Sequence, residues 1–354
     1  MELLKEIIQL LEPLPQAAFL VKDGTIVYAN HNARARGVQQ DTDVDNLICI
    51  GIVEYKHFVS GKLMLTTAIA DIYYNTVVSI MGTYHLFRLE SELSDPELHA
   101  LSLAAQVLRE PLSASMMRIT ELLPKDAIQD SPELLEQVKI INKNLNQLFR
   151  TVRNMADADT AASSCTKELR DIAGLVSEWV EKANTLMEET GHHIVLTSLK
   201  CPVFCEVNPE KLERAFLNLI SNAVKYADKP DTIKVSLSMH AGRLYLSVES
   251  ACSNPQAIFN NSLFTRFSRE PSLSDYQSGI GLGLIIARGI AVAHKGTLLI
   301  DQPSDDRIRF TLSISMRSSG MLTMNSPTIR VVNNGGHDQF LIELADVLPP
   351  ELYK

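Results

Sequence analysis

The sequence predicts an α+β protein of several domains, in which an antiparallel sheet, a two-helix hairpin and an α/β sandwich follow one another. Up to about residue 92, short segments of β-branched and aromatic residues alternate with turn signals. From Asp95 the apolar residues recur at helical spacing, and from Thr166 to Met316 helical and strand patterns mix. The predicted domains are therefore residues 1–92, 93–160 and 166–316, with a C-terminal tail at 317–354.

The composition indicates packed domains in a reducing compartment. Hydrophobic residues make up 45% of the 354 positions and charged residues only 21%, which supports well-filled cores. A net charge of −9 disfavours nucleic acid as a partner, and five cysteines without paired Cys-x-x-Cys motifs suit the cytosol. The most apolar stretch, residues 63–81, contains Asp71 and Asn75 and has strand composition. We therefore expect a soluble, cytoplasmic protein with no signal peptide and no membrane span.

The first 92 residues predict a strand pair, a short middle section and an antiparallel meander. Residues 16–30 form two candidate strands joined at Asp23-Gly24, a pair that readily adopts the positive φ angles of a tight turn. A second hairpin signal lies at Ser60-Gly61. The other strand predictions are residues 50–59, 63–74 and 76–89, the last leading into a helix. With YANHNARARG after the second strand, this order resembles a PAS sensor domain.

Two amphipathic helices follow. The first has its apolar residues at Leu98, Leu101, Ala105, Leu108, Leu112, Ile119 and Leu122. The second opens at Pro132, and its apolar residues are Leu134, Val138, Ile141, Leu145, Leu148, Val152 and Met155. Two such helices joined by a short loop form a hairpin, and a second copy buries its apolar seam best. We expect a homodimeric four-helix bundle; a hairpin packed on its own chain is the alternative.

The segment EKLERAFLNLISNAVKYA carries the first indication of chemistry. Its apolar residues mark one helix face, while Asn218 and Asn222 lie one turn apart on another. Carboxamide oxygens are suitable ligands for Mg²⁺, which takes a few protein oxygens and leaves its other positions to phosphates and water. Lys225 would add a phosphate contact.

A glycine-rich segment, GIGLGL, follows about 57 residues after Asn222 and precedes a helical run. Glycines there let the backbone approach phosphates, and the N-terminus of a helix presents free N–H groups. This ordered set, with LFTRFSR in between, resembles the catalytic ATP-binding domain of sensor histidine kinases over residues 166–316, or about 95–316 with the hairpin. The resemblance implies ATP and Mg²⁺ as cofactors.

The resemblance also implies roles for individual residues. Asn218 and Asn222 match the N-box asparagines, with Asn222 on Mg²⁺. The further nucleotide contacts it implies are Lys225 and Tyr226, Phe264 and Phe267 of the F-box, and Gly279, Gly281 and Gly283 of the second glycine-rich box.

The motif that binds adenine in the family is changed in this chain. Where the family has an aspartate that accepts a hydrogen bond from the adenine amino group, this chain has LSVESACSNP. Leu246, Val248 and Ser250 share one strand face, so Ser250 takes the aspartate's position and Glu249 points the other way. Loss of a charged acceptor weakens binding by about 1.5–3 kcal/mol, or ten- to a hundredfold. We expect weak ATP binding.

The segment AQVLREPL resembles the family's phospho-acceptor motif, and Pro111 fixes its register so that Gln106 stands at the position of the acceptor histidine. A carboxamide has no nucleophilic lone pair comparable to that of imidazole, so phosphoryl transfer to Gln106 is not expected. His99, seven residues earlier, is the alternative acceptor. Gln106 could also orient an attacking water, as glutamine does in GTP hydrolysis.

The leading hypothesis is a dimeric pseudokinase of two-component signalling, in which ATP acts mainly as a conformational ligand. One alternative is an active histidine kinase with a non-standard acceptor; another is a nucleotide-free module that binds a response regulator or a related kinase. The tail contains the apolar segment FLIELADVLPPELY, for which we expect a short helix packed on its own domain, with a docking tail as the alternative.

Overall fold

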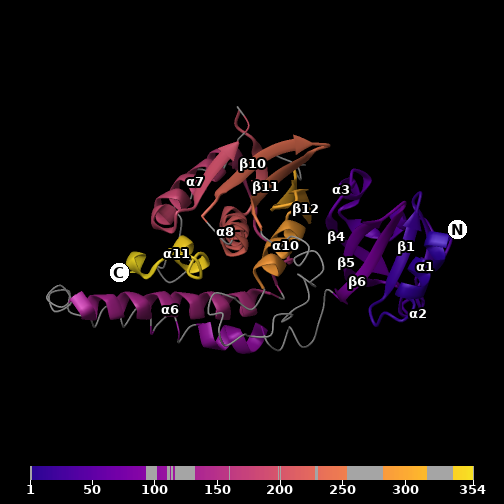
Figure 1. The fold of residues 1–354 in the computed structure, drawn as a ribbon, viewed down its shortest axis with the longest axis horizontal. Coiled ribbons are helices and arrows are strands. Elements are labelled where there is room, and N and C mark those ends of the chain that lie inside the picture. Colours follow the sequence, from indigo (N-terminus) through magenta and orange to yellow (C-terminus); the bar gives the residue numbers. More distant parts are fainter. Residues whose placement is uncertain are drawn as a thin grey trace.

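A computed structural model describes residues 2–92, 102–109, 112, 115, 132–158, 160–197, 199, 201–227, 230–252, 282–316 and 338–353 (Figure 1). The α-helices are α1 (Glu2–Leu11), α2 (His31–Ala35), α3 (Ile52–Lys56), α6 (Pro132–Asp157), α7 (Ile172–Met187), α8 (Pro209–Tyr226), α10 (Gly283–Ala293) and α11 (Gln339–Glu343). The short 3-10 helices are η1 (Val44–Asn46), η2 (Glu188–Thr190) and η3 (Pro350–Leu352). The mixed α+β class predicted from the sequence is confirmed.

Most strands form one sheet that runs through both the N-terminal and the C-terminal parts of the chain. The strands are β1 (Ala18–Lys22), β2 (Thr25–Ala29), β3 (Ile48–Ile50), β4 (Lys62–Ile69), β5 (Ile72–Met81), β6 (Tyr84–Glu92), β7 (Glu168–Asp171), β8 (His193–Thr197), β9 (Phe204–Val207), β10 (Thr232–His240), β11 (Arg243–Ala251), β12 (Leu298–Ser304) and β13 (Arg307–Ser315). The order is β2-β1-β6-β5-β4-β12-β13-β11-β10-β8, with β3 on β4, and β7 and β9 form a separate pair. All neighbours in the large sheet are antiparallel except β8 and β10.

A short antiparallel contact between β4 and β12 joins the two parts of this sheet, with Leu63 opposite Leu299. Side chains from the C-terminal part reinforce it. Arg288 on α10 donates a hydrogen bond to the carbonyl oxygen of Leu65 at 2.9 Å, and Ser313 donates to Glu54 at 2.6 Å. Segments more than 200 residues apart are therefore held together by backbone pairing and by buried polar contacts.

The N-terminal part confirms some strand predictions and corrects others. The β1–β2 hairpin turns at Asp23-Gly24, where φ is 50° and 80°. The strand prediction for residues 50–59 was wrong beyond β3, because Gly51, at φ 97°, turns the chain into α3 and buries Glu54 against the C-terminal part. Ser60-Gly61 consequently leads from α3 into β4 and is not a hairpin turn. Residues 63–74 and 76–89 divide into β4, β5 and β6, with turns at Ala70-Asp71 and at Gly82-Thr83.

The helical region agrees with its sequence pattern where the structure describes it. Residues 102–109 are helical, and α6 begins at Pro132 as predicted. Ser102 donates a hydrogen bond to the carbonyl oxygen of Ala156, and Ala105 packs against Val152 and Ala156. The two helices therefore lie against each other near the end of α6. Most of the first predicted helix lies outside the described residues.

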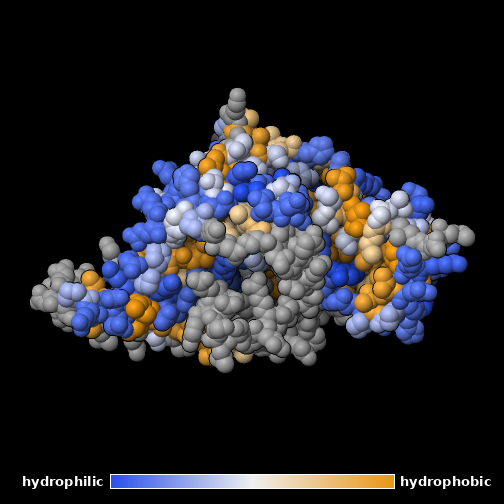
Figure 2. Space-filling model, in the orientation of Figure 1, coloured by the Kyte–Doolittle hydropathy of each residue, from blue (hydrophilic) through white to orange (hydrophobic). Residues whose placement is uncertain are grey.

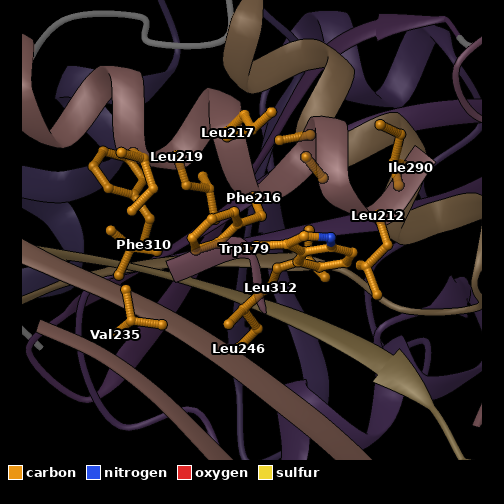
Figure 3. Close-up of a cluster of buried hydrophobic side chains, with 14 of the residues drawn as sticks. Trp179, Leu212, Phe216, Leu217, Leu219, Val235, Leu246, Ile290, Phe310 and Leu312 are labelled. Atoms are coloured by element: carbon orange, nitrogen blue, oxygen red, sulfur yellow. The ribbon is translucent and has the colours of Figure 1, made fainter. Parts of the chain in front are cut away.

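Helix α8 stands in the centre of the C-terminal core (Figure 3). Asn208 caps it by accepting a hydrogen bond from the Lys211 amide at 2.9 Å, and Pro209 occupies the first turn, where no backbone donor is needed. Phe216 stacks on Trp179 of α7, with ring centroids 5.8 Å apart. The apolar face predicted from the sequence, Leu212, Phe216, Leu219, Ile220 and Ala223, is buried, and so are polar residues on other sides of the helix, among them Arg214, Asn218 and Ser221. This packing fixes the direction of the polar face.

The end of the chain folds back onto this core. Helix α11 and the turns after it lie between α6 and α8 (Figure 1). Phe340, Leu344, Leu348 and Tyr353 are buried in the same core as Phe216. The prediction of a short helix packed on its own chain is confirmed for residues 338–353.

Candidate functional site

The C-terminal half of α8 carries the predicted N-box residues. Asn218 is fully buried, whereas Asn222, Lys225 and Tyr226 are partly exposed near the end of the helix. Tyr226 also stacks on Phe310 of β13, with ring centroids 6.1 Å apart. The helix therefore presents two carboxamides and an ammonium group within two turns.

Asn218 is held by protein groups on both ends of its carboxamide. Its Nδ2 donates to the carbonyl oxygen of Arg214 at 2.9 Å and to Glu343 Oε2 at 3.1 Å. Its Oδ1 accepts from Arg150 Nη2 at 3.1 Å. The carboxamide therefore bridges α8 to α6 and to the C-terminal segment.

Gly283, at the start of α10, lies close to the same side chain. A Cβ atom at this position would stand 2.7 Å from Asn218 Oδ1, closer than non-bonded atoms allow. A side chain at position 283 would therefore push the Asn218 carboxamide out of its present hydrogen bonds. The other predicted glycines, Gly279 and Gly281, lie outside the described residues, as do Phe264 and Phe267.

Lys225 meets a carboxylate that the sequence did not associate with this site. Its Nζ hydrogen bonds to Asp346 Oδ2, and Arg150 Nη1 hydrogen bonds to the same oxygen. Burial alone would raise the pKa of Asp346, but the charges of Arg150 and Lys225 outweigh it and hold the pKa below its ordinary value. Asp346 is therefore ionised at neutral pH.

Glu343 is the second carboxylate of this cluster, and it is fully buried. Its oxygens lie 2.8 Å from Arg214 Nε, 3.3 Å from Arg150 Nε and 3.6 Å from Arg153 Nη1. Burial favours the neutral acid, but the arginine charges, Arg214 first, outweigh it and keep the pKa of Glu343 low. A buried carboxylate is stable here only because it is surrounded by cations.

Buried polar atoms without a hydrogen-bond partner, within the part of the chain that the structure describes, include Asn222 Nδ2 and Ser250 Oγ, and also Ser221 Oγ next to Asn222 on α8. Buried polar groups are nearly always hydrogen-bonded, so an unpaired donor or hydroxyl points to a ligand or water. Together with the glycine at 283, this donor set fits a nucleotide with a divalent cation, for which Asn222 would provide the protein oxygen.

Ser250 faces the core from β11, as the alternation along the strand predicts. Leu246, Val248 and Ser250 are buried on one face. Glu249 points to the opposite face, where its carboxylate lies 2.9 Å from Arg307 Nε. No carboxylate of β11 therefore stands where the family's aspartate would be.

Gln106 is exposed on the helical segment 102–109, beside Val107, which is 74% exposed. Arg109 lies 4.0 Å from Asp157 at the end of α6. His99, the alternative acceptor, lies outside the described residues. The side chain of residue 106 is thus an exposed carboxamide on this helical segment.

A cavity of about 300 Å³ lies at the opposite end of α8. Its lining includes Asn208, Lys211 and Arg214 of α8 and its cap, with Asp157 of α6 and Ile290 of α10. None of the predicted nucleotide residues that the structure describes lines this cavity. It is therefore separate from the N-box end of the helix.

The sequence reasoning missed the contribution of the chain terminus and of α6. Glu343 and Asp346 stand alone as acids within the apolar stretch FLIELADVL, and Arg150 lies on the predicted seam helix. Such isolated charges among core residues indicate buried ion pairs, but a partner more than 100 residues away leaves no local pattern. Across the residues that are described, no helix has the length and apolarity needed to cross a membrane.

Comparison with known proteins matches the part of the chain that contains α8, β11 and α10. The family profile of the histidine kinase-, DNA gyrase B- and HSP90-like ATPase matches residues 207–318. The sensor histidine kinase CusS of Escherichia coli strain K12 is 29% identical over 218 residues, 59% of this chain and 44% of CusS. The probable sensor protein PcoS of Escherichia coli is 30% identical over 205 residues, 56% of this chain and 42% of PcoS.

A crystal structure of the histidine kinase ThkA in complex with the response regulator TrrA aligns with 87% of this chain and 98% of that chain, at 17% identity and a TM-score of 0.42. The chain spans less than half the length of CusS and PcoS. The chain therefore contains an ATPase domain of the histidine kinase-, DNA gyrase B- and HSP90-like kind, and it is similar to sensor histidine kinases over somewhat more than half of its length.

Proposed function

We propose that the chain is a regulatory member of the sensor histidine kinase family that binds Mg-ATP at the C-terminal half of α8 and does not transfer phosphate to residue 106. One observation carries the nucleotide site: Asn222 Nδ2 and Ser250 Oγ are buried without hydrogen-bond partners among the described residues, within the domain that matches the ATPase profile. A ligand with polar groups would satisfy both atoms.

Different residues of α8 would contact different parts of the bound Mg-ATP. Asn222 would bind Mg²⁺ through its carboxamide oxygen, and the bound ion would neutralise part of the phosphate charge. Lys225 would contact a phosphate, and Tyr226, already stacked on Phe310, would line the nucleotide. Ser250 offers a hydroxyl where the family has a carboxylate, which favours weak binding.

Because residue 106 is glutamine, it cannot accept the γ-phosphate of ATP as the family's histidine does. Its amide nitrogen is conjugated with the carbonyl and does not attack phosphorus, so the standard autokinase reaction is absent. ATP would then act as a ligand that stabilises one arrangement of the domains, provided that its affinity differs between them. A glutamine that orients water for dephosphorylation of a partner remains part of this proposal.

The other domains of the proposed molecule are a PAS-like input domain at residues 1–92 and a dimerising helical hairpin at residues 93–160. The half-exposed apolar positions of α6 support a homodimer, because an isolated helix rarely leaves a regular stripe of large aliphatic residues in water. A response regulator or a related kinase is the proposed partner of the helices. We place this assembly in the cytoplasm.

Incubation of the purified protein with γ-labelled ATP tests nucleotide use and acceptor together. We expect saturable Mg-ATP binding by titration calorimetry and no acid-labile phosphoprotein. Acid-labile label that disappears in His99→Ala would establish instead an active kinase with a displaced acceptor. No heat of binding at millimolar nucleotide would reject the site.

A nucleotide-free interaction module is the second candidate. It is favoured by the contacts of Asn218 and Lys225, which already engage carboxylates of the chain's own terminus. In that case partner capture would be the same for the wild type and for Asn222→Ala, with or without Mg-ATP. Under the leading proposal, nucleotide changes partner capture by the wild type and not by Asn222→Ala.

A further inference from the structure

The C-terminal segment 338–353 is docked by apolar anchors over the polar side of α8. Phe340, Ile342 and Leu344 are at most 2% exposed, and Ile342 packs on Phe149 of α6. Asp338 caps α11 by accepting from the Phe340 amide at 2.8 Å. The segment is therefore built into the fold as a defined element.

Hydrogen bonds between side chains and backbone carbonyl oxygens also hold the segment in place. Gln147 of α6 donates to the carbonyl oxygen of Ala345 at 3.1 Å, and Gln339 donates to the carbonyl oxygen of Glu210 at 3.1 Å. Tyr353 donates through its hydroxyl to the carbonyl oxygen of Leu341 at 2.8 Å, which closes the segment on itself. These contacts set the register that brings two acids to α8.

These two acids bind Lys225, to which the proposed function gives a phosphate contact, and Asn218, the first of the two predicted N-box asparagines. Glu343 accepts from Asn218, and Asp346 accepts from Lys225. Both carboxylates also contact Arg150, which reaches the site from α6. A carboxylate offers the same negatively charged oxygen acceptors as a phosphate, so it satisfies the same donors.

The charge of the cluster requires an anion at this place. Arg150, Arg153 and Arg214 are buried, and Lys225 is partly buried beside them. If Glu343 and Asp346 left and nothing replaced them, Arg150 would lose both of its ion pairs with described residues, and Arg153 and Arg214 would each keep an ion pair with Asp157. Buried cations without counter-charges are strongly unfavourable.

We infer that residues 338–353 act as an intrachain competitor of the nucleotide, with Glu343 and Asp346 holding the phosphate-binding groups of α8 until ATP displaces them. The inference rests on the proposed nucleotide site. The apparent affinity for ATP is then the intrinsic affinity reduced by the fraction of molecules in which the segment is undocked. The terminus thereby sets the nucleotide concentration at which the protein responds.

Two substitutions undock the segment by different means. Asp346→Asn removes the charge that meets Lys225, and Ile342→Ala removes an apolar anchor without changing any charge. Glu351→Gln is the matched control, because Glu351 lies on the same segment, is exposed, and changes charge by the same amount as Asp346→Asn. Binding of a fluorescent ATP analogue with Mg²⁺ is measured by titration in the full-length chain.

We expect Asp346→Asn and Ile342→Ala each to bind the nucleotide at least tenfold more tightly than the wild type, and Glu351→Gln to bind as the wild type does. Equal affinities in all four proteins would overturn the competition and leave the nucleotide site standing. No binding by any of them at millimolar nucleotide would overturn the site and the competition together.

Hydrogen exchange provides a second measurement, which uses the wild type and needs no substitution. Saturating Mg-ATP is expected to accelerate exchange of the backbone amides of residues 339–348 at least tenfold, while the amides of β11 stay protected. Unchanged protection of residues 339–348 at saturation would show that nucleotide and segment bind together, and would refute the inference.

Discussion

Ser250 is a residue whose replacement tests the nucleotide site directly. Its hydroxyl is buried at the end of β11 without a described partner, where the family has an aspartate. We expect Ser250→Asp to raise the affinity for Mg-ATP about ten- to a hundredfold, because a charged acceptor contributes about 1.5–3 kcal/mol more than a neutral one. The measurement is calorimetric titration.

The same substitution should lower the free energy of unfolding in the absence of nucleotide by about 1–3 kcal/mol, because the new carboxylate is buried without a partner. Ser238→Asp is the control, since Ser238 is exposed on the neighbouring strand and should change neither quantity. An unaltered affinity in Ser250→Asp would mean that adenine is not read from this strand.

His294 gives the fold a dependence on pH. Its Nε2 accepts from the Asn208 amide at 3.0 Å, and its Nδ1 donates to the carbonyl oxygen of Ile290 at 2.7 Å, which fixes the neutral ring. Burial lowers the pKa of His294 from 6.5 to about 4. Between these values the unfolded chain binds more protons, so stability is complete above pH 6.5 and falls by up to about 3 kcal/mol as the pH decreases to 4.

Urea unfolding at several pH values measures this dependence. His294→Gln keeps an acceptor for the Asn208 amide but does not titrate, so the slope between pH 4 and 6.5 should decrease. His31→Gln, at an exposed histidine, should retain the wild-type slope. Equal slopes in all three proteins would contradict the assignment to His294.

Among the secondary-structure elements, the contact of β4 with β12 depends on one glycine. Gly61 precedes β4 at φ 86°, and a Cβ atom there would lie 2.2 Å from the carbonyl oxygen of Ile300. We expect Gly61→Ala to lower the free energy of unfolding by about 3–4 kcal/mol, from strain at positive φ and from displacement of the strand pair. Amide exchange of residues 62–65 should rise.

Gly24→Ala is a matched control, because Gly24 has φ 80° but nothing within 4 Å of the added atom. It should cost only the conformational strain, about 1–2 kcal/mol, and leave the exchange of residues 62–65 unchanged. If both variants lost the same stability, the strand junction would not depend on Gly61.

The elements differ in how far the sequence predicts them. The helix α8 has a cap, a first-turn proline and a regular apolar face, and each of these is local, so its start and its buried side are predictable. The helix α3 has the composition of a strand, and it forms because Gly51 turns the chain and Glu54 finds Ser313 and Arg243. Those partners are distant in sequence, so the residues near Ile52 are not enough to predict that α3 is a helix.

At the scale of the whole molecule, exposed apolar residues on α6 indicate how two copies of the chain associate. Leu134, Ile141 and Leu148 recur every seven residues and are 43%, 46% and 49% exposed. Hydrophobic side chains interrupt the hydrophilic surface over α6 in Figure 2. We expect the chain to be a dimer by sedimentation equilibrium and Ile141→Lys to shift it to the monomer, because a lysine in an apolar seam costs about 2–4 kcal/mol per copy.

Glu136→Gln changes the charge of α6 by the same amount as Ile141→Lys, but Glu136 lies on the other side of the helix and should leave the dimer intact. A monomeric wild type, or a dimer that persists in Ile141→Lys, would reject this stripe as the contact between copies.

Several features can be read directly from the sequence: the α+β class, the helix α8 with its two asparagines, the start of α6, and the serine and glutamine at positions 250 and 106. All of these depend on local periodicity, on capping or on residue identity. The tertiary structure alone decided that β4 continues the C-terminal sheet and that Glu343 and Asp346 meet Asn218 and Lys225. The physical reason is that buried ion pairs and edge-strand contacts join residues more than 100 positions apart, and their energy depends on geometry that no short stretch of sequence encodes.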